Sequence, residues 1–122
     1  MNGNSSVALT RNVVITASKP VKKEDFVKKI AETAKSLVDY LKLNGCEKLG
    51  HIKFISTTNG EDYLQYSVID MSQEPTTKGI LRKTFDKIKL TLNIIEFGVG
   101  KDDIGRKVER EIKHMQEYFS RL

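Results

Sequence analysis

The chain has 122 residues, of which 39% are hydrophobic and 30% charged, and 21 Lys and Arg against 16 Asp and Glu leave a net charge of +5. This length suits a single domain, and the composition is typical of a folded globular protein and excludes a disordered one. The single cysteine cannot form an intrachain disulfide, which favours a reducing compartment, and no apolar run is long enough to cross a membrane. We expect a cytoplasmic protein with no membrane contact.

At the N-terminus, residues 1–6 are polar, and we expect them to be disordered ahead of a single domain over residues 7–122. Residues 7–18 then place their apolar side chains at alternate positions, which is the period of a β-strand. These side chains are Val7, Leu9, Val13 and Ile15.

After Pro20 the apolar spacing changes to that of an amphipathic helix. Glu24 and Asp25 lie in its first turn, where negative charge complements the helix dipole. Asn44-Gly45 supplies the left-handed residue that ends such a helix. Its apolar stripe includes Phe26, Ile30, Leu37 and Leu41.

From Leu49 the chain alternates again, and residues 62–70 form the return strand of a hairpin with its turn at residues 58–61. Residues 71–84 contain a proline and a glycine and are predicted to be a loop. Residues 87–97 alternate as a further strand, and a second amphipathic helix runs from Asp102 to the C-terminus. The polar side chains of these strands are His51, Lys53, Tyr63, Gln65, Lys87, Lys89 and Thr91.

The expected element order is β-α-β-β-β-α. Each helix is apolar on one side only, so both can be buried only against one face of the sheet. The sequence therefore predicts an α+β two-layer sandwich, in which a four-stranded, mainly antiparallel sheet carries two helices on one face. The opposite face would be polar, and it is the candidate binding face.

Cys46 and His51 are close enough in sequence to suggest a metal site or a nucleophile pair. A structural zinc site needs about four ligands, whereas the chain has one cysteine and two histidines in total. A Cys–His nucleophile also needs an orienting group and an oxyanion hole, and the sequence indicates neither. We expect Cys46 to be a small residue in a helix-to-strand turn and His51 to lie on the polar face, with metal binding as the weaker alternative.

Catalytic motifs are lacking elsewhere. The stretch GVGKDDIG has neither the spacing nor the Ser/Thr of a P-loop, so it is predicted to connect a strand to a helix. The adjacent acidic pairs fall at helix starts or in a hairpin turn, where carboxylates serve as caps and turn residues. We therefore expect no catalytic residue, no enzyme activity and no cofactor.

A basic segment offers another candidate site, with Lys78, Arg82, Lys83, Lys87 and Lys89 close together. With the strand residues named above it would give the sheet a positive face with one aromatic, in the general manner of sheets that bind single-stranded RNA. Those sheets carry at least two aromatics in a defined motif that this sequence lacks. A solvated face is the leading interpretation, and nucleic-acid binding is the alternative.

Ile69, Ile95 and Phe97 are apolar, although their parity places them on the polar face. They either form an exposed patch that contacts a second copy or another protein, or they mark a bulge at Ile94-Ile95.

Three stretches, ITASKPVKKEDFVKKIAE, LNGCEKLGHIKFI and YLQYSVIDMSQEPTTKG, resemble the small C-terminal domain of CobW-type cobalamin-synthesis GTPases and metallochaperones. The shared pattern covers roughly residues 13–79: a strand, a helix that starts after a proline, a Gly-His-Ile-Lys strand, and a hairpin strand that leads to a Pro-Thr loop. The P-loop and the Cys-x-Cys-Cys metal motif of that family's GTPase domain are absent from the sequence, so no catalytic or metal residue carries over. The resemblance implies a stand-alone accessory or interaction domain.

Together these features predict a small non-enzymatic binding or interaction module. Its partner would be a second copy, forming a homodimer, or another protein, and its contact surface would be the polar face and the 78–89 segment. Two alternatives stay open: a nucleic-acid-binding domain, and a metal-handling accessory protein that binds the metal through His51 and Cys46.

Overall fold

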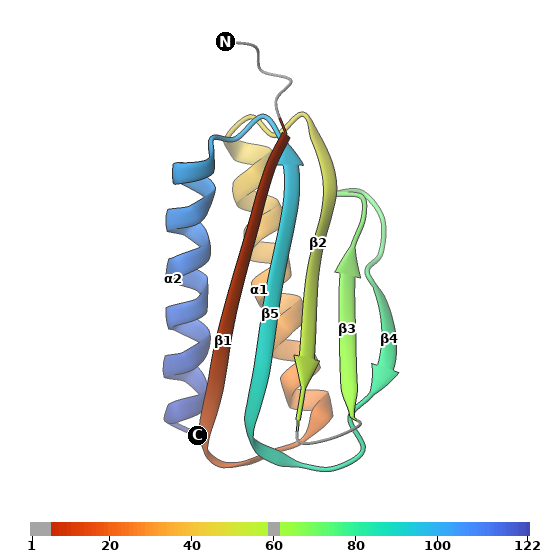
Figure 1. Cartoon of the computed structure of the whole chain (residues 1–122), viewed down its shortest axis with the longest axis vertical. Coiled ribbons are helices and arrows are strands. Elements are labelled where there is room, and N and C mark those ends of the chain that lie inside the picture. Colours follow the sequence, from red (N-terminus) through yellow and green to blue (C-terminus); the bar gives the residue numbers. More distant parts are fainter. Residues whose placement is uncertain (1–5, 59–61) are drawn as a thin grey trace.

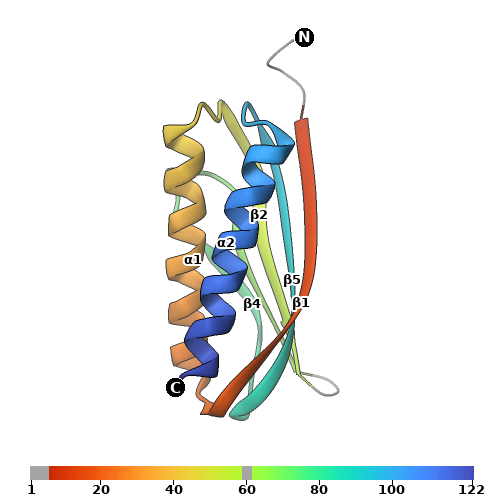
Figure 2. The same cartoon turned by 90° about the vertical axis from the view of Figure 1, so that its left-hand side faces the viewer.

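The computed structural model describes residues 6–58 and 62–122, which form five strands and two helices. The elements are β1 (Ser6–Val21), α1 (Lys23–Leu43), β2 (Lys48–Thr57), β3 (Tyr63–Val68), β4 (Thr76–Ile80), β5 (Phe85–Phe97) and α2 (Lys101–Ser120). The strands join one antiparallel sheet in the order β1-β5-β2-β3-β4 (Figure 1). Both helices lie on the same side of it (Figure 2). The α+β architecture with two helices on one face is thus confirmed.

The predicted number of strands is wrong, because the segment 71–84 contains β4 instead of being a loop throughout. The element order is β-α-β-β-β-β-α, with five strands instead of four. Every residue of β4 is exposed, so no apolar alternation marks it in the sequence. The strand forms because its backbone pairs with β3, from Tyr63↔Ile80 to Ser67↔Thr76. Such pairing satisfies backbone groups and needs no buried side chain.

The first helix ends as its sequence predicts. Asn44 caps α1, and Gly45 follows with a φ of 92°, in the left-handed region that favours glycine. The backbone N–H of Cys46 then donates to the carbonyl oxygen of Leu41 at 3.0 Å, which completes a Schellman motif. Glu24 and Asp25 occupy the first turn, as expected from the helix dipole.

The core lies between the sheet and the two helices, and its centre is aromatic. The ring centroid of Phe26 in α1 lies 5.2 Å from that of Phe85 in β5 and 5.8 Å from that of Phe119 in α2. Phe26 and Phe119 are fully buried. Because this cluster joins both helices to the sheet, it holds them on one face and leaves the other uncovered (Figure 2).

A bulge is present, but not where the sequence suggests one. The pairing of β2 with β5 shifts between Leu49 and His51, which places the bulge at Gly50. At Ile94-Ile95, β5 keeps a regular register with β1, so the prediction of a bulge there is wrong. A Cβ on Gly50 would lie 2.9 Å from both the Cγ2 and the carbonyl oxygen of Ile95, so a glycine lets the strands approach.

Some predictions fall outside the described residues. The predicted disordered segment 1–6 does so except for Ser6, where β1 begins. Of the predicted hairpin turn, only Thr58 is described, although the antiparallel pairing of β2 with β3 is present. Neither helix in the described part of the chain is long and apolar enough to cross a bilayer.

Candidate binding face

The candidate site is the open face, meaning the side of the sheet that is turned away from α1 and α2 and toward the viewer in Figure 1. Its members follow from the strand register, because directly paired residues point to the same side. They are Ala8, Thr10, Asn12, Val14, Thr16, Lys48, His51, Lys53, Ile55, Thr57, Tyr63, Gln65, Ser67, Thr76, Lys78, Ile80, Lys87, Lys89, Thr91, Asn93, Ile95 and Phe97.

The open face is positively charged. Its cations are the ammonium groups of Lys48, Lys53, Lys78, Lys87 and Lys89, and none of them forms an ion pair with a described carboxylate. No Asp or Glu occupies an open-face position in the strands that the structure describes. Burial and then the charge of Lys53 lower the pKa of His51, so near neutral pH the imidazole is uncharged.

Aromatic and amide groups lie among these lysines. Tyr63 is 46% exposed, and its ring lies over Gly79, where an added Cβ would come within 2.7 Å of the ring Cε2. The hydroxyl of Thr91 donates a hydrogen bond to the Oδ1 of Asn12 at 2.7 Å, and the hydroxyl of Thr10 donates one to the Oδ1 of Asn93 at 2.6 Å. Each asparagine therefore offers its Nδ2 to a ligand, and both amides are oriented by a neighbour.

Arg82 and Lys83 belong to the connection between β4 and β5 and not to the sheet. The guanidinium Nη1 of Arg82 lies 3.1 Å from the Oδ1 of Asp62, and its backbone N–H donates to the Oδ2 of Asp62 at 2.8 Å. Asp62 thus compensates most of the charge of Arg82. Lys83, Lys87 and Lys89 gather with Arg82 around one hollow at the end of the sheet where β5 begins, and the carboxylates of Asp62 and Asp86 also line this hollow.

The structure separates Cys46 from His51. The thiol of Cys46 lies near the carboxyl of Glu96 on the helix side of the sheet and donates to the carbonyl oxygen of Lys48 at 3.4 Å. Burial, reinforced by the charge of Glu96, raises the pKa of this thiol, so it is a poor nucleophile. His51 lies on the open face, opposite Ile95. The two side chains form no nucleophile pair, and no group of three potential metal ligands occurs among the residues described.

Glu96 is a buried carboxylate that is not among the site residues predicted from the sequence. It is fully buried on the helix side of β5, where its Oε1 accepts a hydrogen bond from the N–H of Val99 at 3.0 Å. Its Oε2 has no hydrogen-bond partner in the described structure. Burial raises the pKa of this carboxyl despite the opposing hydrogen bond from Val99. The alternation of inward and outward side chains along β5, continued two residues beyond Ile94, predicts that Glu96 points into the core.

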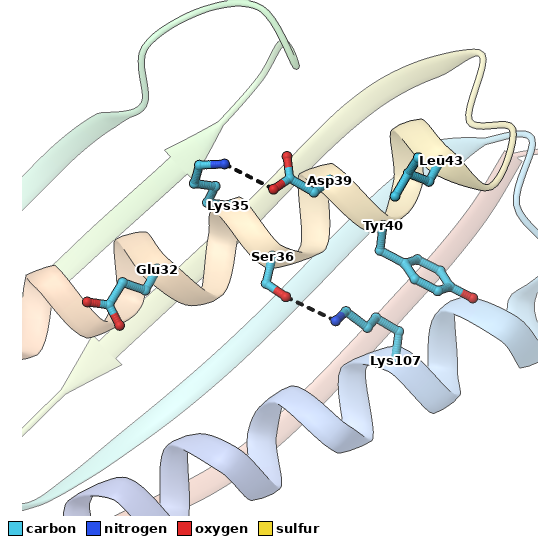
Figure 3. Close-up of a pocket in the computed structure, with 7 residues that line it drawn as sticks. All are labelled: Glu32, Lys35, Ser36, Asp39, Tyr40, Leu43 and Lys107. Carbon is cyan, nitrogen blue, oxygen red and sulfur yellow. Dashed lines mark hydrogen bonds and ion pairs between the residues drawn. The ribbon is translucent and has the colours of Figure 1, made fainter.

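A second polar cluster joins the two helices (Figure 3). The Nζ of Lys107 lies 3.0 Å from the Oγ of Ser36 and 2.9 Å from the Oε2 of Glu111, and the Ser36 hydroxyl donates to the same Oε2 at 3.0 Å. The ammonium of Lys107 and the hydroxyl of Ser36 both contact the same carboxylate oxygen of Glu111, so this cluster links α1 to α2.

The three apolar residues predicted to lie on the polar face, Ile69, Ile95 and Phe97, differ in their exposure to solvent. Ile95 and Phe97 are half-buried on it, and Ile69, just beyond the end of β3, is 53% exposed. Their position on the face agrees with their parity, because β5 contains no bulge that would turn them inward.

No family model and no curated protein matches the sequence. Two solved structures align with it: the Zn(II)-bound YjiA GTPase from E. coli and a Zn(II)-bound triple mutant of the YjiA GTPase. Each shows 13% identity and a TM-score of 0.41, and covers 82% of this chain but only 29% of the solved chain. This chain therefore spans less than a third of the length of either solved structure.

Proposed function

We propose that this protein is a non-enzymatic binding module whose open face takes a polyanionic partner, and that the partner is single-stranded nucleic acid. The observation that carries the proposal is the charge of that face: five lysines and no carboxylate in its described strands. A surface that served solubility alone would carry interspersed positive and negative charges. A surface that carries positive charges alone attracts and orients an anion.

The uncharged groups of the open face favour nucleic acid over other polyanions. Bases stack on aromatic rings, and the half-exposed ring of Tyr63 lies on the same face as Lys53 and Lys89. The oriented amides of Asn12 and Asn93 provide donors for base edges or for sugar oxygens.

The hollow beside β5 extends the binding surface toward the end of the sheet. A strand of nucleic acid that follows Lys53 and Lys89 would reach Lys87 and then Lys83. Arg82 contributes less, because Asp62 already holds its guanidinium.

Fluorescence anisotropy with a labelled oligothymidylate of about 12 nucleotides tests the proposal, because such sheets cover sites of roughly 4–16 nucleotides. Replacing Lys53, Lys87 and Lys89 by Gln should reduce the slope of log K against log salt concentration by about 2, because each lost phosphate contact with a single strand lowers that slope by ~0.7. Tyr63→Leu should weaken binding by about 1–3 kcal/mol and leave the salt slope unchanged.

The matched control replaces three exposed lysines of the helices, Lys28, Lys42 and Lys113, by Gln. It changes the net charge by the same amount and should leave both affinity and slope close to those of the wild type. Equal losses in the two triple variants, or the absence of binding at low salt, would refute the proposal. Heparin that binds as well as the oligonucleotide and is indifferent to Tyr63→Leu would refute the choice of nucleic acid.

A further inference from the structure

The two edges of the sheet are built very differently. The β4 edge is five residues long, fully exposed, preceded by Pro75 and interrupted by Gly79 with a φ of 81°. The β1 edge is 16 residues long and pairs with β5 without a break from Ser6 to Thr16. No strand pairs with its other side in the sheet as described (Figure 2). Alternate N–H and C=O groups of β1 therefore point away from the sheet.

Between Ser6 and Thr16 the β1 edge lacks the features that usually protect such a strand, whereas Lys19, Pro20 and a register shift after Thr16 mark its far end. Proteins block exposed edges with lysines, prolines, bulges or very short strands. Between Ser6 and Ser18 the sequence has no lysine and no proline, and its one charged residue is Arg11. The Nε of Arg11 donates to the Oε1 of Glu109 at 2.8 Å and its Nη1 donates to the carbonyl oxygen of Thr10 at 3.0 Å, so this guanidinium lies against the backbone of β1 and a second strand would have to displace it at Thr10.

The surface next to this edge can receive the side chains of an added strand. α2 runs along β1, and a groove between them is lined by Leu9, Arg11, Gly105, Arg106, Glu109 and Arg110. The side chain of Arg11 lies over Gly105, where an added Cβ would be at an ordinary contact distance of 3.8 Å from a guanidinium nitrogen. On the α2 side, the groove is lined by both positive and negative side chains, Arg106, Arg110 and Glu109. The same side chains of a second copy can therefore meet them with opposite charges.

We infer that β1 pairs with β1 of a second copy of this chain, antiparallel and about a two-fold axis at Asn12. An axis at Arg11 would set two guanidinium groups opposite each other, whereas an axis at Asn12 pairs Arg11 with Val13 of the second copy. On the open face the same axis pairs Thr10 with the second copy's Val14. On the helix side it pairs Leu9 with Ile15, both of which are buried in each chain.

The consequence is one continuous sheet made of two five-stranded sheets. The two open faces would lie side by side and double the set of lysines available to one ligand. This dimer does not depend on the ligand class, so it stands or falls separately from nucleic-acid binding.

Sedimentation velocity of the full chain provides the test. The wild type should sediment at about twice the chain mass of 13.9 kDa. The double variant Thr10→Lys/Val14→Lys puts like charges opposite each other across the axis and should be monomeric at concentrations where the wild type is dimeric. The double variant Thr10→Lys/Val14→Glu puts opposite charges there and should restore the dimer.

Thr10 and Val14 are exposed in the single chain, so all variants should keep the far-ultraviolet circular dichroism spectrum of the wild type, although a monomeric variant should unfold at a lower urea concentration than a dimer. The matched control, Thr76→Lys/Ile80→Lys, adds the same charge at the β4 edge and should remain dimeric. A wild type that is monomeric throughout, or a dimer that survives Thr10→Lys/Val14→Lys, would overturn the inference.

Discussion

The helix side and the open face of the sheet are formed by the same strands but hold opposite kinds of side chain. Along β5, Ile88, Leu90 and Ile94 are at most 1% exposed on the helix side, whereas Lys87 and Lys89 stand in solvent on the open face. Because side chains alternate along a strand, one segment can carry both sets. We therefore expect stability and the proposed binding to be separable: changes on the helix side should alter folding, and changes on the open face should alter binding.

The largest effect on stability should come from the aromatic cluster that holds both helices. Phe26→Ala removes a fully buried ring that packs against Phe85 and Phe119. We expect the free energy of unfolding to fall by about 3–5 kcal/mol, since the cavity cannot close completely. Urea denaturation followed by circular dichroism measures the loss.

The matching change on the open face is Tyr63→Ala. Because this ring is 46% exposed, we expect less than about 1 kcal/mol of destabilisation, while oligonucleotide binding weakens. A comparable loss of stability in Phe26→Ala and Tyr63→Ala would show that the two faces are not separable in this way.

An intermediate effect is expected at the cluster between the helices. Lys107→Met leaves the carboxylate of Glu111 without its cation, and the side chain of Glu111 is only 13% exposed. We expect a loss of about 1–3 kcal/mol, because a shielded charge is left unpaired. Lys35→Met, which breaks a pair whose lysine is 77% exposed, should cost only about 0.3–0.5 kcal/mol.

The double variant Lys107→Met/Glu111→Leu separates the contribution of the charges from that of packing. It removes both charges, so much of the stability lost in Lys107→Met should return. If the double variant is less stable than Lys107→Met, the cluster contributes through packing and not through its charges.

The smallest effect should appear at Glu96, and it should depend on pH. Burial raises the folded-state pKa of this carboxyl, so its contribution to stability is complete below the unfolded-state pKa and is lost as the pH rises through the folded-state pKa. Glu96→Gln removes the ionisation and keeps an acceptor for the N–H of Val99. It should be more stable than the wild type near neutral pH, and the difference should shrink in acid.

Urea midpoints of wild type and Glu96→Gln between about pH 4 and pH 8 measure this trend around the ordinary range of a glutamate. A difference that stays constant over this range would mean that Glu96 does not change its protonation between the folded and unfolded states.

Much of the fold follows from local patterns. The two-residue period correctly assigns His51, Lys53 and Tyr63 to one side of the sheet, and Asn44-Gly45 correctly marks the end of α1. The candidate site is less predictable. Arg82 has the composition of a binding residue, but its pairing with Asp62 appears only once the connection between β4 and β5 is placed beside β3.

Spacing along the chain alone is enough to predict the two helices, the alternating strands and the side chains that share a face, including the inward position of Glu96. The strand β4, the bulge at Gly50 and the open edge at β1 emerge only when the chain is folded. Each of these depends on backbone hydrogen bonds or burial between segments far apart in sequence, and no local pattern of side chains encodes such contacts.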